Sequence, residues 1–375
     1  MAGYCKDIVM FANVYKNKRI FITGHTGFKG SWLTAWLVNL GAELAGFADR
    51  VPTSPSNFEA LGLAGRIRDI RGDVRDRNAL FAAMRDFAPD MVFHLAAQSL
   101  VRVSYQEPAL TFETNAMGTL NILEAVRKTP SVRAVVCITS DKCYRNDEWV
   151  WGYREQDHLG GDDPYSASKG CAEIVAHSYF KSFFKDGPAC ATTRAGNVIG
   201  GGDWALDRIV PDCARAWAAG SAVQIRSPHA TRPWQHVLEP LSGYLWLGAR
   251  LVGETREAFT LTGEPYNFGP AADANNTVAE VVDALALHWP GFHSAMDREC
   301  VPGMQECTLL KLCCDKALAY LGWKATLDFE ESIRYTAEWY RAYYAPDRPD
   351  MLAFTLGQIF AYTVAAEARG LPWAG

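Results

Sequence analysis

The sequence predicts a doubly wound α/β fold, a parallel sheet covered by helices on both faces. Two observations carry this prediction: short apolar runs recur along the first half of the chain, and segments with apolar residues at three- and four-residue spacing separate them. The expected strands are residues 19–24, 42–48, 91–97, 134–140 and 189–195, and the expected helices are residues 30–41, 77–87, 110–128 and 164–184.

After residue 200 the pattern changes, because Gly, Trp and Pro become frequent and only residues 210–220 and 278–289 look like isolated helices. We therefore expect residues 1–199 to form a Rossmann-type dinucleotide-binding domain and residues 200–375 to form mainly a smaller substrate-binding domain. Residues 265–270 (PYNFGP) look like a late strand, so a segment near residues 235–270 is expected to return to the first domain.

The composition is that of a globular protein, with 49% hydrophobic and 21% charged residues among 375. A net charge of −5 gives no reason to expect nucleic acid as a partner. The ten cysteines form no CxxC pair or His/Cys cluster, which indicates reduced thiols and no metal site. No apolar run has the features of a signal peptide or the length of a membrane span, so we expect a cytoplasmic protein without a membrane partner.

A glycine-rich turn directly follows the first expected strand. Gly24, Gly27 and Gly30 are spaced GxxGxxG, and such a turn at a helix N-terminus suits a pyrophosphate. Incidental glycines in an ordinary strand-to-helix turn are the alternative, but the position in the first βα unit favours a dinucleotide. The other residues of this expected cofactor turn are His25, Thr26, Phe28 and Lys29.

Two acidic residues follow later strands. Asp49, after the second strand, has the spacing of a carboxylate on the adenosine ribose, which favours NAD over NADP. The adjacent Arg50 weakens that inference. Asp73, with Val74, is expected near the adenine; each acid taken alone would be a solvated turn residue.

Tyr165 and Lys169 lie four residues apart at the start of an expected helix, which places both side chains on one face. A nearby ammonium lowers the pKa of a phenol, so Tyr165 is expected to take a proton near neutral pH. A surface tyrosine beside a lysine is the alternative. Together with the glycine turn, the pair predicts a redox enzyme.

The fifth expected strand ends at Ser140, Asp141 and Lys142, at the sheet edge where open α/β sheets bind ligands. A simple dehydrogenase needs only a hydroxyl there, from Ser140 or the neighbouring Thr139. The acid and the lysine are surplus to that need and indicate a second proton transfer. A solvated turn is the alternative.

Several segments resemble the CDP-glucose 4,6-dehydratases, which belong to the extended, sugar-nucleotide-modifying branch of the short-chain dehydrogenase/reductases. The likeness covers residues 16–345. The dTDP-glucose relatives carry an Asp-Glu pair where Asp141 and Lys142 stand. The segments that carry the resemblance are TGHTGFKGSWL, ITSDKCY, DDPYSASKG, RAGNVIGGGDWALDRIVPD and TRPWQHVLEPLSGYL.

The resemblance implies that a hydride moves from sugar C4 to NAD, water is lost across C5 and C6, and the hydride returns to C6. Tyr165 would be the base, held by Lys169, and Asp141 would protonate the departing hydroxyl. Lys142 stands where relatives use a glutamate to remove the C5 proton. It would either do so with a depressed pKa or stabilise the enolate while another group takes the proton.

Further residues are expected at the ligands. At the cofactor these are Leu95, Ala96, Ala97, Gln98 and Asn115. At the nucleotide sugar they are Gln98, Arg102, Ser104, Tyr105, Asn197, Arg208, Arg226, Arg232, His236, Glu306 and Lys311, with Trp204 and Trp234 flanking sugar or base if they are not core residues.

One position departs from the family pattern. Where relatives show LKLDxSKA, this chain has LKLCCDKA, with Cys313 in place of the aspartate. Because that region helps to cover the nucleotide, the choice of base is less certain than the hydride chemistry.

Three functions are consistent with the sequence. The first is a CDP-glucose 4,6-dehydratase making CDP-4-keto-6-deoxyglucose for deoxysugar synthesis, as in lipopolysaccharide O-antigen. The second is a related dehydratase or epimerase with another nucleotide base, and the third is a non-catalytic NAD-binding regulator. Apolar residues on more than one face of the helices near residues 113–126 and 168–180 predict a homodimer with a four-helix contact.

Overall fold

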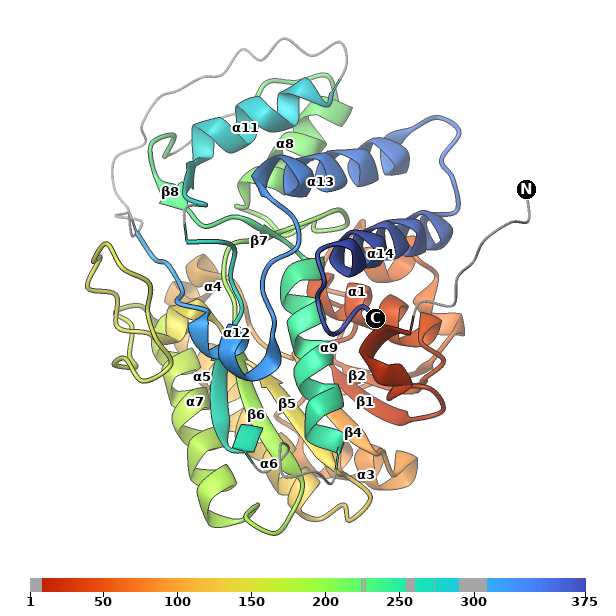
Figure 1. Ribbon diagram of the computed structural model, residues 1–375, viewed down its shortest axis with the longest axis vertical. Helices are drawn as coiled ribbons and strands as arrows, with labels where there is room; N and C mark the ends of the chain where they lie inside the picture. Colours follow the sequence, from red (N-terminus) through yellow and green to blue (C-terminus); the bar gives the residue numbers. More distant parts are fainter. Residues whose placement is uncertain (1–8, 224, 226, 254–259, 273, 290–308) are drawn as a thin grey trace.

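A seven-stranded parallel sheet forms the centre of the protein, seen in Figure 1 in a computed structural model. The structure describes residues 9–223, 225, 227–253, 260–272, 274–289 and 309–375. The strand order is β10-β6-β5-β4-β1-β2-β3. The strands are β1 (Arg19–Thr23), β2 (Glu43–Ala48), β3 (Arg68–Arg71), β4 (Met91–His94), β5 (Ala134–Ile138), β6 (Ala189–Arg194) and β10 (Glu264–Asn267).

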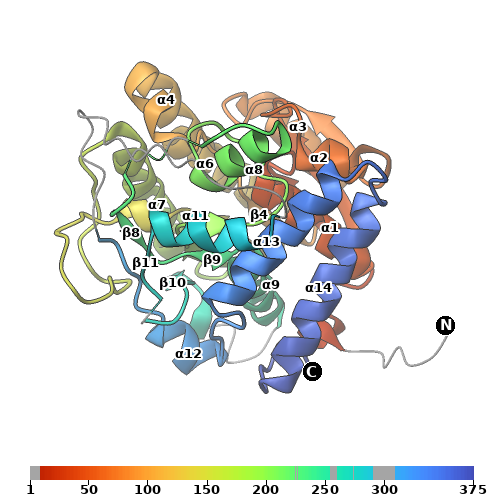
Figure 2. The ribbon, with the colours of Figure 1, turned by 90° about the horizontal axis from the view of Figure 1, so that it is seen from above.

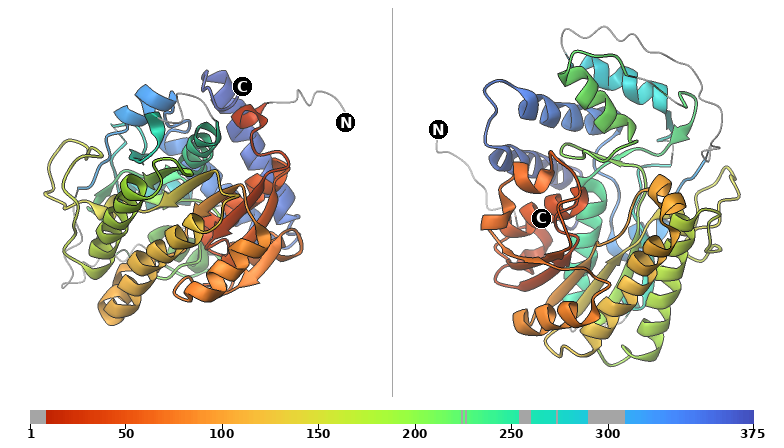
Figure 3. Two further views of the ribbon diagram at one scale, coloured as in Figure 1. Left: turned by 90° about the horizontal axis from the view of Figure 1, so that it is seen from below. Right: turned by 180° about the vertical axis from the view of Figure 1, so that it is seen from behind.

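Helices cover both faces of the sheet, as the view from below shows (Figure 3). On one face lie α3 (Arg77–Phe87), α6 (Gly118–Arg127) and α7 (Pro164–Ser182); on the other lie α1 (Phe28–Asn39) and α9 (Leu238–Val252). The predicted doubly wound α/β fold is confirmed. The predicted late strand is confirmed as well, because β10 pairs in parallel with β6.

The alternation of side chains along β1 explains the two layers. Ile20 and Ile22 point into the core beneath α1 and α9, whereas Phe21 points into the core beneath α3 and α6. All three are completely buried, as expected for a parallel strand covered on both faces.

A smaller layer of helices lies beyond the carboxyl ends of the strands (Figures 1 and 2). It contains α8 (Ile209–Ala218), α11 (Val278–Leu287) and α13 (Phe329–Tyr344), with the two-stranded sheets β7–β9 (Val198–Ile199, Gln235–His236) and β8–β11 (Thr231–Arg232, Asn276–Thr277). The division into domains at residue 199 stays a prediction. The remaining elements are η1 (Met10–Asn13), α2 (Asn57–Ala60), η2 (Leu63–Gly65), α4 (Val101–Gln106), α5 (Pro108–Phe112), η3 (Glu113–Met117), η4 (Asp141–Cys143), α12 (Asp315–Leu321) and α14 (Met351–Ala368).

The C-terminal helix α14 differs from expectation, because its length and composition are those of a membrane span. It packs against α1 and α13, and 44% of it is buried within the protein. The ring of Tyr362 contacts Trp36 and Trp373, and its hydroxyl donates to the carboxylate of Glu239 at 2.9 Å. The apolar residues on its buried face, such as Ile359 and Tyr362, therefore belong to the core of this protein.

Candidate active site

The glycine turn lies at the topological switch point, where β1 and β4 run side by side and their connections leave in opposite directions. Gly24 has φ +73°, and a Cβ there would lie 2.7 Å from the backbone nitrogen of Ala96. A Cβ on Gly30 would lie 2.1 Å from the Gly24 carbonyl oxygen, whereas one on Gly27 would meet no atom closer than 3.4 Å. The turn thus packs tightly behind Gly24 and Gly30 and stays open at Gly27, which fits a pyrophosphate against the N-terminus of α1.

Buried hydrogen bonds hold this switch point. The Thr23 hydroxyl lies 2.7 Å from Nδ1 of His94 and accepts the Ala96 N–H at 3.2 Å. Nε2 of His94 lies 3.1 Å from the Thr119 hydroxyl. Burial lowers the pKa of His94 to about 3, so the ring is neutral and purely structural.

Two side chains of the turn face away from the open side. The buried His25 ring lies 2.9 Å from the Asp69 carboxylate, and a Cβ on Gly46 would come within 2.3 Å of it. The Thr26 hydroxyl donates to the Arg50 carbonyl at 2.7 Å. The prediction that His25 and Thr26 belong to the cofactor turn stays a prediction, and with their side chains held in this way it would rest on their backbone atoms. The half-buried Phe28 lies near Gly200.

The two predicted adenosine contacts lie at neighbouring strand ends. Asp49 is exposed after β2 and accepts the Arg50 N–H at 2.9 Å. Asp73, after β3, accepts three hydrogen bonds from the Arg75 guanidinium, which hold its pKa below the usual value. Val74 is buried.

Gln98 and Asn115 stabilise the loop after β4, which begins with Leu95, Ala96 and Ala97. Asn115 accepts the Gln98 N–H at 2.8 Å and donates to the Gln98 carbonyl at 3.0 Å and to the Ser168 hydroxyl at 2.8 Å. The Gln98 amide donates to the Leu100 carbonyl and the Thr111 hydroxyl. Asn115 lies in the π-helical turn η3, which interrupts the single helix predicted for residues 110–128 and links this loop to α7.

The predicted acid segment forms the short turn η4 after β5. The Ser140 hydroxyl donates to the Asp141 carboxylate at 2.8 Å and accepts the Lys142 N–H at 3.2 Å. Asp141 is 3% exposed and Lys142 is half-buried. A Cβ on Gly196 would lie 1.7 Å from Asp141 Oδ2, so the carboxylate packs directly on the Gly196 backbone.

Tyr165 and Lys169 are brought to the same place by α7, whose N-terminus is capped by Asp163. Ser140 hydrogen-bonds the Tyr165 phenol, but burial raises the pKa of this phenol to about 12. Burial lowers the pKa of Lys169 to about 8, and its ammonium donates to the Ile138 carbonyl at 3.5 Å. The predicted proton transfer to Tyr165 near neutral pH therefore needs more than the four-residue spacing, because desolvation of the phenolate is the largest cause that acts on the pKa of this phenol.

Thr139 requires a correction. Its hydroxyl donates to the carboxylate of Glu173 and to the Thr193 carbonyl, at 3.2 Å for the latter, so it points into the sheet and away from Tyr165. Ser140 is therefore the hydroxyl of this segment that faces the phenol.

Lys29 lies near the acid, and Arg208 and Lys169 lie near Lys29. Burial lowers the pKa of Lys29 to about 8; Asp141 opposes this shift, while Arg208 and Lys169 add to it. Arg208, predicted at the substrate, donates to the Asp203 carboxylate at 2.7 Å and also lowers the pKa of Tyr165. The sequence predicted Lys29 only as a cofactor residue, but it lies within electrostatic range of the acid and of Lys169.

The other residues predicted at the substrate lie in different environments, some paired with other groups of the protein and some exposed. Arg102 pairs with Asp207 at 3.0 Å, Asn197 has φ +52° beside Gly196, and Tyr105 is 61% exposed. Arg232 lies in β8 with its guanidinium on the Thr231 carbonyl, and Lys311 donates to the Ala272 carbonyl. Arg226 and Glu306 lie outside the described residues.

Two of those predictions are corrected. His236 is completely buried between the rings of Trp32 and Tyr335, with a pKa lowered to about 3, so it belongs to the core. Ser104 is also completely buried and donates to the Val101 carbonyl at 2.7 Å. Trp204 packs among aromatic residues of α13, and Trp234 donates to the Asn276 carbonyl.

Replacing Gly196 with Ala is expected to lower kcat by about 10- to 100-fold, because the new methyl displaces the carboxylate that Ser140 orients. Steady-state kinetics together with a cofactor-binding titration test this, and cofactor affinity is expected to stay unchanged. Gly357→Ala on α14, where no atom lies within 4 Å, is the matched control and is expected to keep full activity. Equal activity of both variants would contradict the placement of Asp141.

Comparisons with known proteins show the family of this chain. The model of the GDP-mannose 4,6-dehydratase family matches residues 21–336. A CDP-glucose 4,6-dehydratase of Salmonella typhimurium is 46% identical over 360 residues, covering 94% of this chain and 98% of the relative. This chain belongs to the nucleotide-sugar 4,6-dehydratases. Within that family it has Asp141 followed by a lysine, placed beside the Tyr165–Lys169 face.

Solved structures of other enzymes have the same fold as this dehydratase. The dTDP-glucose 4,6-dehydratase of Bacillus anthracis, in complex with NAD, superposes with a TM-score of 0.70 at 21% identity over 86% of this chain and 96% of its own. The Thermus thermophilus UDP-glucose 4-epimerase, also a complex with NAD, gives a TM-score of 0.71 at 26% identity over 86% and 99%. The fold is therefore common to dehydratases and epimerases, and the side chains must distinguish them.

Proposed function

We propose that this protein is a CDP-glucose 4,6-dehydratase, a hydro-lyase that forms CDP-4-keto-6-deoxyglucose. The observation that carries the proposal is the placement of Asp141, bonded to Ser140, beside the Tyr165–Lys169 face of α7. An oxidoreductase needs the hydroxyl, the phenol and the ammonium, but not the acid. The 46% identity to the Salmonella enzyme across nearly the whole of both chains supports CDP-glucose as substrate.

NAD is the cofactor of the proposed reaction, and the site fits it. The open backbone at Gly27, the N-terminus of α1 and the acid at the end of β2 match a diphosphate and an adenosine ribose. When bound, its nicotinamide takes up the C4 hydride and returns it to C6. Its positive charge, when it is bound, would also favour the phenolate form of Tyr165.

The residues of this chain handle the protons. Tyr165 accepts the proton of the C4 hydroxyl, with Ser140 on the same hydrogen-bond chain. Asp141 then delivers a proton to the departing C6 hydroxyl, which neutralises the leaving group. Ser140 orients the acid for this second transfer.

Lys142 is assigned to the C5 position, where relatives use a glutamate. Lys29 lies near Asp141, and Lys169 and Arg208 lie near Lys29, so this group of cations favours negative charge on the enolate that loss of the C5 proton creates. Arg208 and Arg232 are the assigned contacts of the nucleotide diphosphate.

A panel of CDP-, dTDP-, UDP- and GDP-glucose tests the function, with the alkaline absorbance of a 4-keto product as the readout. We expect CDP-glucose to be converted with a kcat/KM at least about tenfold above the others. The 46% identical relative supports this ranking, although Cys313 departs from the family pattern. Conversion to the C4 epimer without loss of water would instead favour an epimerase, and binding of NAD with no turnover would favour a regulator.

A homodimer is part of the proposal, as are a cytoplasmic location and a role in deoxysugar synthesis. Exposed apolar side chains lie on the predicted contact helices, where Met117 is 49% exposed and Ile174 60%, and Phe183 at the end of α7 is 53% exposed. Light scattering is expected to give twice the chain mass, and Ile174→Glu is expected to shift it toward the monomer. A monomer mass for the unmodified protein would contradict the dimer.

A further inference from the structure

A buried ion pair lies directly beneath the acid segment. Arg194, at the end of β6, and Glu173, on α7, are 2% and 4% exposed in their side chains. The guanidinium is bidentate, with Nε 2.9 Å and Nη2 2.8 Å from the two carboxylate oxygens. The sequence analysis missed both residues, although Glu173 follows Lys169 by one helical turn and thus continues the face that carries Tyr165.

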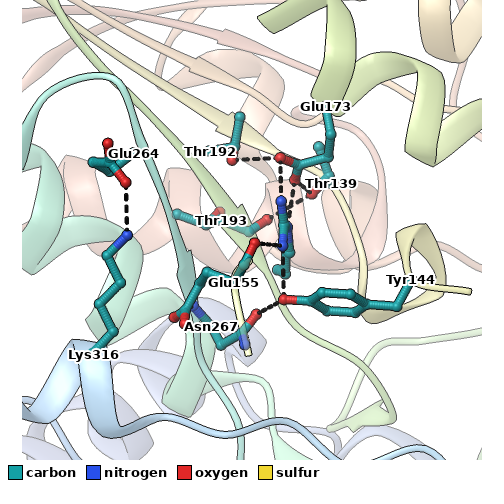
Figure 4. A network of polar contacts seen from close by, with 10 residues as sticks. Thr139, Tyr144, Glu155, Glu173, Thr192, Thr193, Glu264, Asn267 and Lys316 are labelled. Carbon is teal, nitrogen blue, oxygen red and sulfur yellow. Dashed lines mark hydrogen bonds and ion pairs between the residues drawn. The ribbon is translucent and has the colours of Figure 1, made fainter. Parts of the chain in front are cut away.

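The pair holds both ends of the segment that carries Ser140, Asp141 and Lys142. At the beginning, the Thr139 hydroxyl donates to Glu173. At the end, Arg194 Nη1 donates to the Tyr144 hydroxyl at 2.7 Å, and the guanidinium lies over that ring at 4.8 Å. Figure 4 shows Thr139 and Tyr144 on opposite sides of this network.

Further hydrogen bonds fill both carboxylate oxygens and both N–H groups of Nη1. Glu173 also accepts the Thr192 hydroxyl at 2.8 Å, and Arg194 donates to the Glu155 carbonyl at 3.0 Å. The Tyr144 hydroxyl donates to Asn267, whose backbone N–H is accepted by the Glu155 carboxylate at 2.9 Å (Figure 4). The ends of β5, β6 and β10 are thereby fixed to α7. A buried ion pair adds little stability compared with apolar residues of similar volume. The network is therefore better explained by the position that it gives to the acid segment.

The second consequence of the ion pair concerns the charge near Lys169. Glu173 raises the pKa of Lys169 against the effect of burial, and Arg194 keeps the two-residue network neutral. The other groups near Lys169 are Tyr165 on the same face of α7, Cys137 on β5, Cys143 on η4, Lys29 on α1 and the neutral His94 on β4. The anion that supports the ammonium of Lys169 therefore comes from its own helix.

We propose that Glu173 and Arg194 are positioning residues of the active site, which set the distance between the acid segment and the Tyr165–Lys169 face and supply the anion that keeps Lys169 protonated. Neither residue touches substrate. The inference rests on the proposed function for its catalytic consequence, but its effect on Lys169 does not.

The positioning part is tested by substitutions at Thr139. Thr139→Val removes the hydrogen bond to Glu173 and leaves the ion pair in place, so kcat is expected to fall about tenfold or more while KM changes less than twofold. Thr139→Ser restores the hydroxyl and is expected to recover most of the activity. A Val variant as active as the unmodified enzyme, or a Ser variant as slow as the Val variant, would overturn this part.

The charge part is tested by titrating Lys169 in the full chain without cofactor or substrate, by ¹³C NMR of lysine Cε assigned with Lys169→Met. Glu173→Gln is expected to lower the Lys169 pKa by about one unit, since it removes the anion and leaves the guanidinium uncompensated. Glu173→Gln/Arg194→Met removes both charges and is expected to restore only part of the lost pKa, so that its value lies between those of Glu173→Gln and the unmodified chain, because Glu173 acts on Lys169 more strongly than Arg194 does. Glu264→Gln, which breaks the nearby pair with Lys316 (Figure 4), is the control and is expected to change nothing.

An unmoved Lys169 titration in Glu173→Gln overturns the charge part. If Glu173→Gln does not fold, the double variant and Glu264→Gln still decide the question. A mere loss of packing predicts that both variants have the Lys169 pKa of the unmodified chain. Loss of the supporting anion predicts a lower Lys169 pKa in the double variant alone. Failure of the proposed function gives a different pattern: no sugar nucleotide is converted by the unmodified enzyme, while the Lys169 titration still responds to Glu173.

Discussion

Tyr165→Phe is expected to lower kcat by about 10³-fold or more while NAD still binds with nearly its normal affinity. The phenol is the group that accepts the proton of the C4 hydroxyl, and the ring itself is buried and packs the same way without its oxygen. Steady-state turnover of CDP-glucose and a fluorescence titration with NAD measure the two effects separately.

The matched control is Tyr179→Phe on the same helix, whose hydroxyl bonds Glu124 at 3.1 Å far along α7 from the acid segment. It is expected to keep activity within about twofold. Substantial activity in Tyr165→Phe would remove this residue as the base and would return Ser140 or Lys169 to consideration.

Asp141→Asn is expected to separate the two halves of the reaction. Oxidation at C4 needs Tyr165 and the cofactor and should continue, but the C6 hydroxyl then leaves without a proton donor, so turnover is expected to fall about 10²-fold or more. The near-ultraviolet absorbance of reduced nicotinamide on the enzyme is therefore expected to rise and persist after CDP-glucose is added.

Asp76→Asn, at the cap of α3 away from the site, is its control, because asparagine caps a helix as well as aspartate does. That variant should behave as the unmodified enzyme. Slow turnover of Asp141→Asn with no build-up of reduced cofactor would show that Asp141 acts before or during C4 oxidation and not at C6.

Much of the fold follows from sequence because its signals are local. The apolar runs that became β1, β4, β5 and β6 are short and bounded by helical periodicity, and Gly24 marks a turn that no other residue would fit. Tyr165 and Lys169 were found for the same reason, since a four-residue spacing on one helix is enough to bring them together.

Contacts between distant segments could not be predicted from the sequence. Thr139 and Ser140 are adjacent and chemically alike, yet only packing against Glu173 decides that Thr139 points into the sheet. His236 lies in a motif beside Arg232, and its burial between two aromatic rings depends on α1 and α13. Gly196 supports Asp141 from another strand end, and no local pattern indicates that close approach.

The pKa of Tyr165 illustrates the same limit in energetic terms. Spacing predicts the ammonium beside the phenol, but the cost of burying a phenolate depends on how completely the surrounding layers exclude water. Only the folded chain shows that burial is the largest cause acting on the pKa of this phenol.

The central claim is that one bound nicotinamide takes electrons from C4 of the sugar and returns them to C6 of the same molecule. The direct measurement is conversion of CDP-glucose deuterated at C4, followed by mass spectrometry and NMR of the product. The account predicts that the deuterium appears in the C6 methyl group with little loss to solvent. A product with no label at C6, or with label lost in proportion to added unlabelled cofactor, would contradict it.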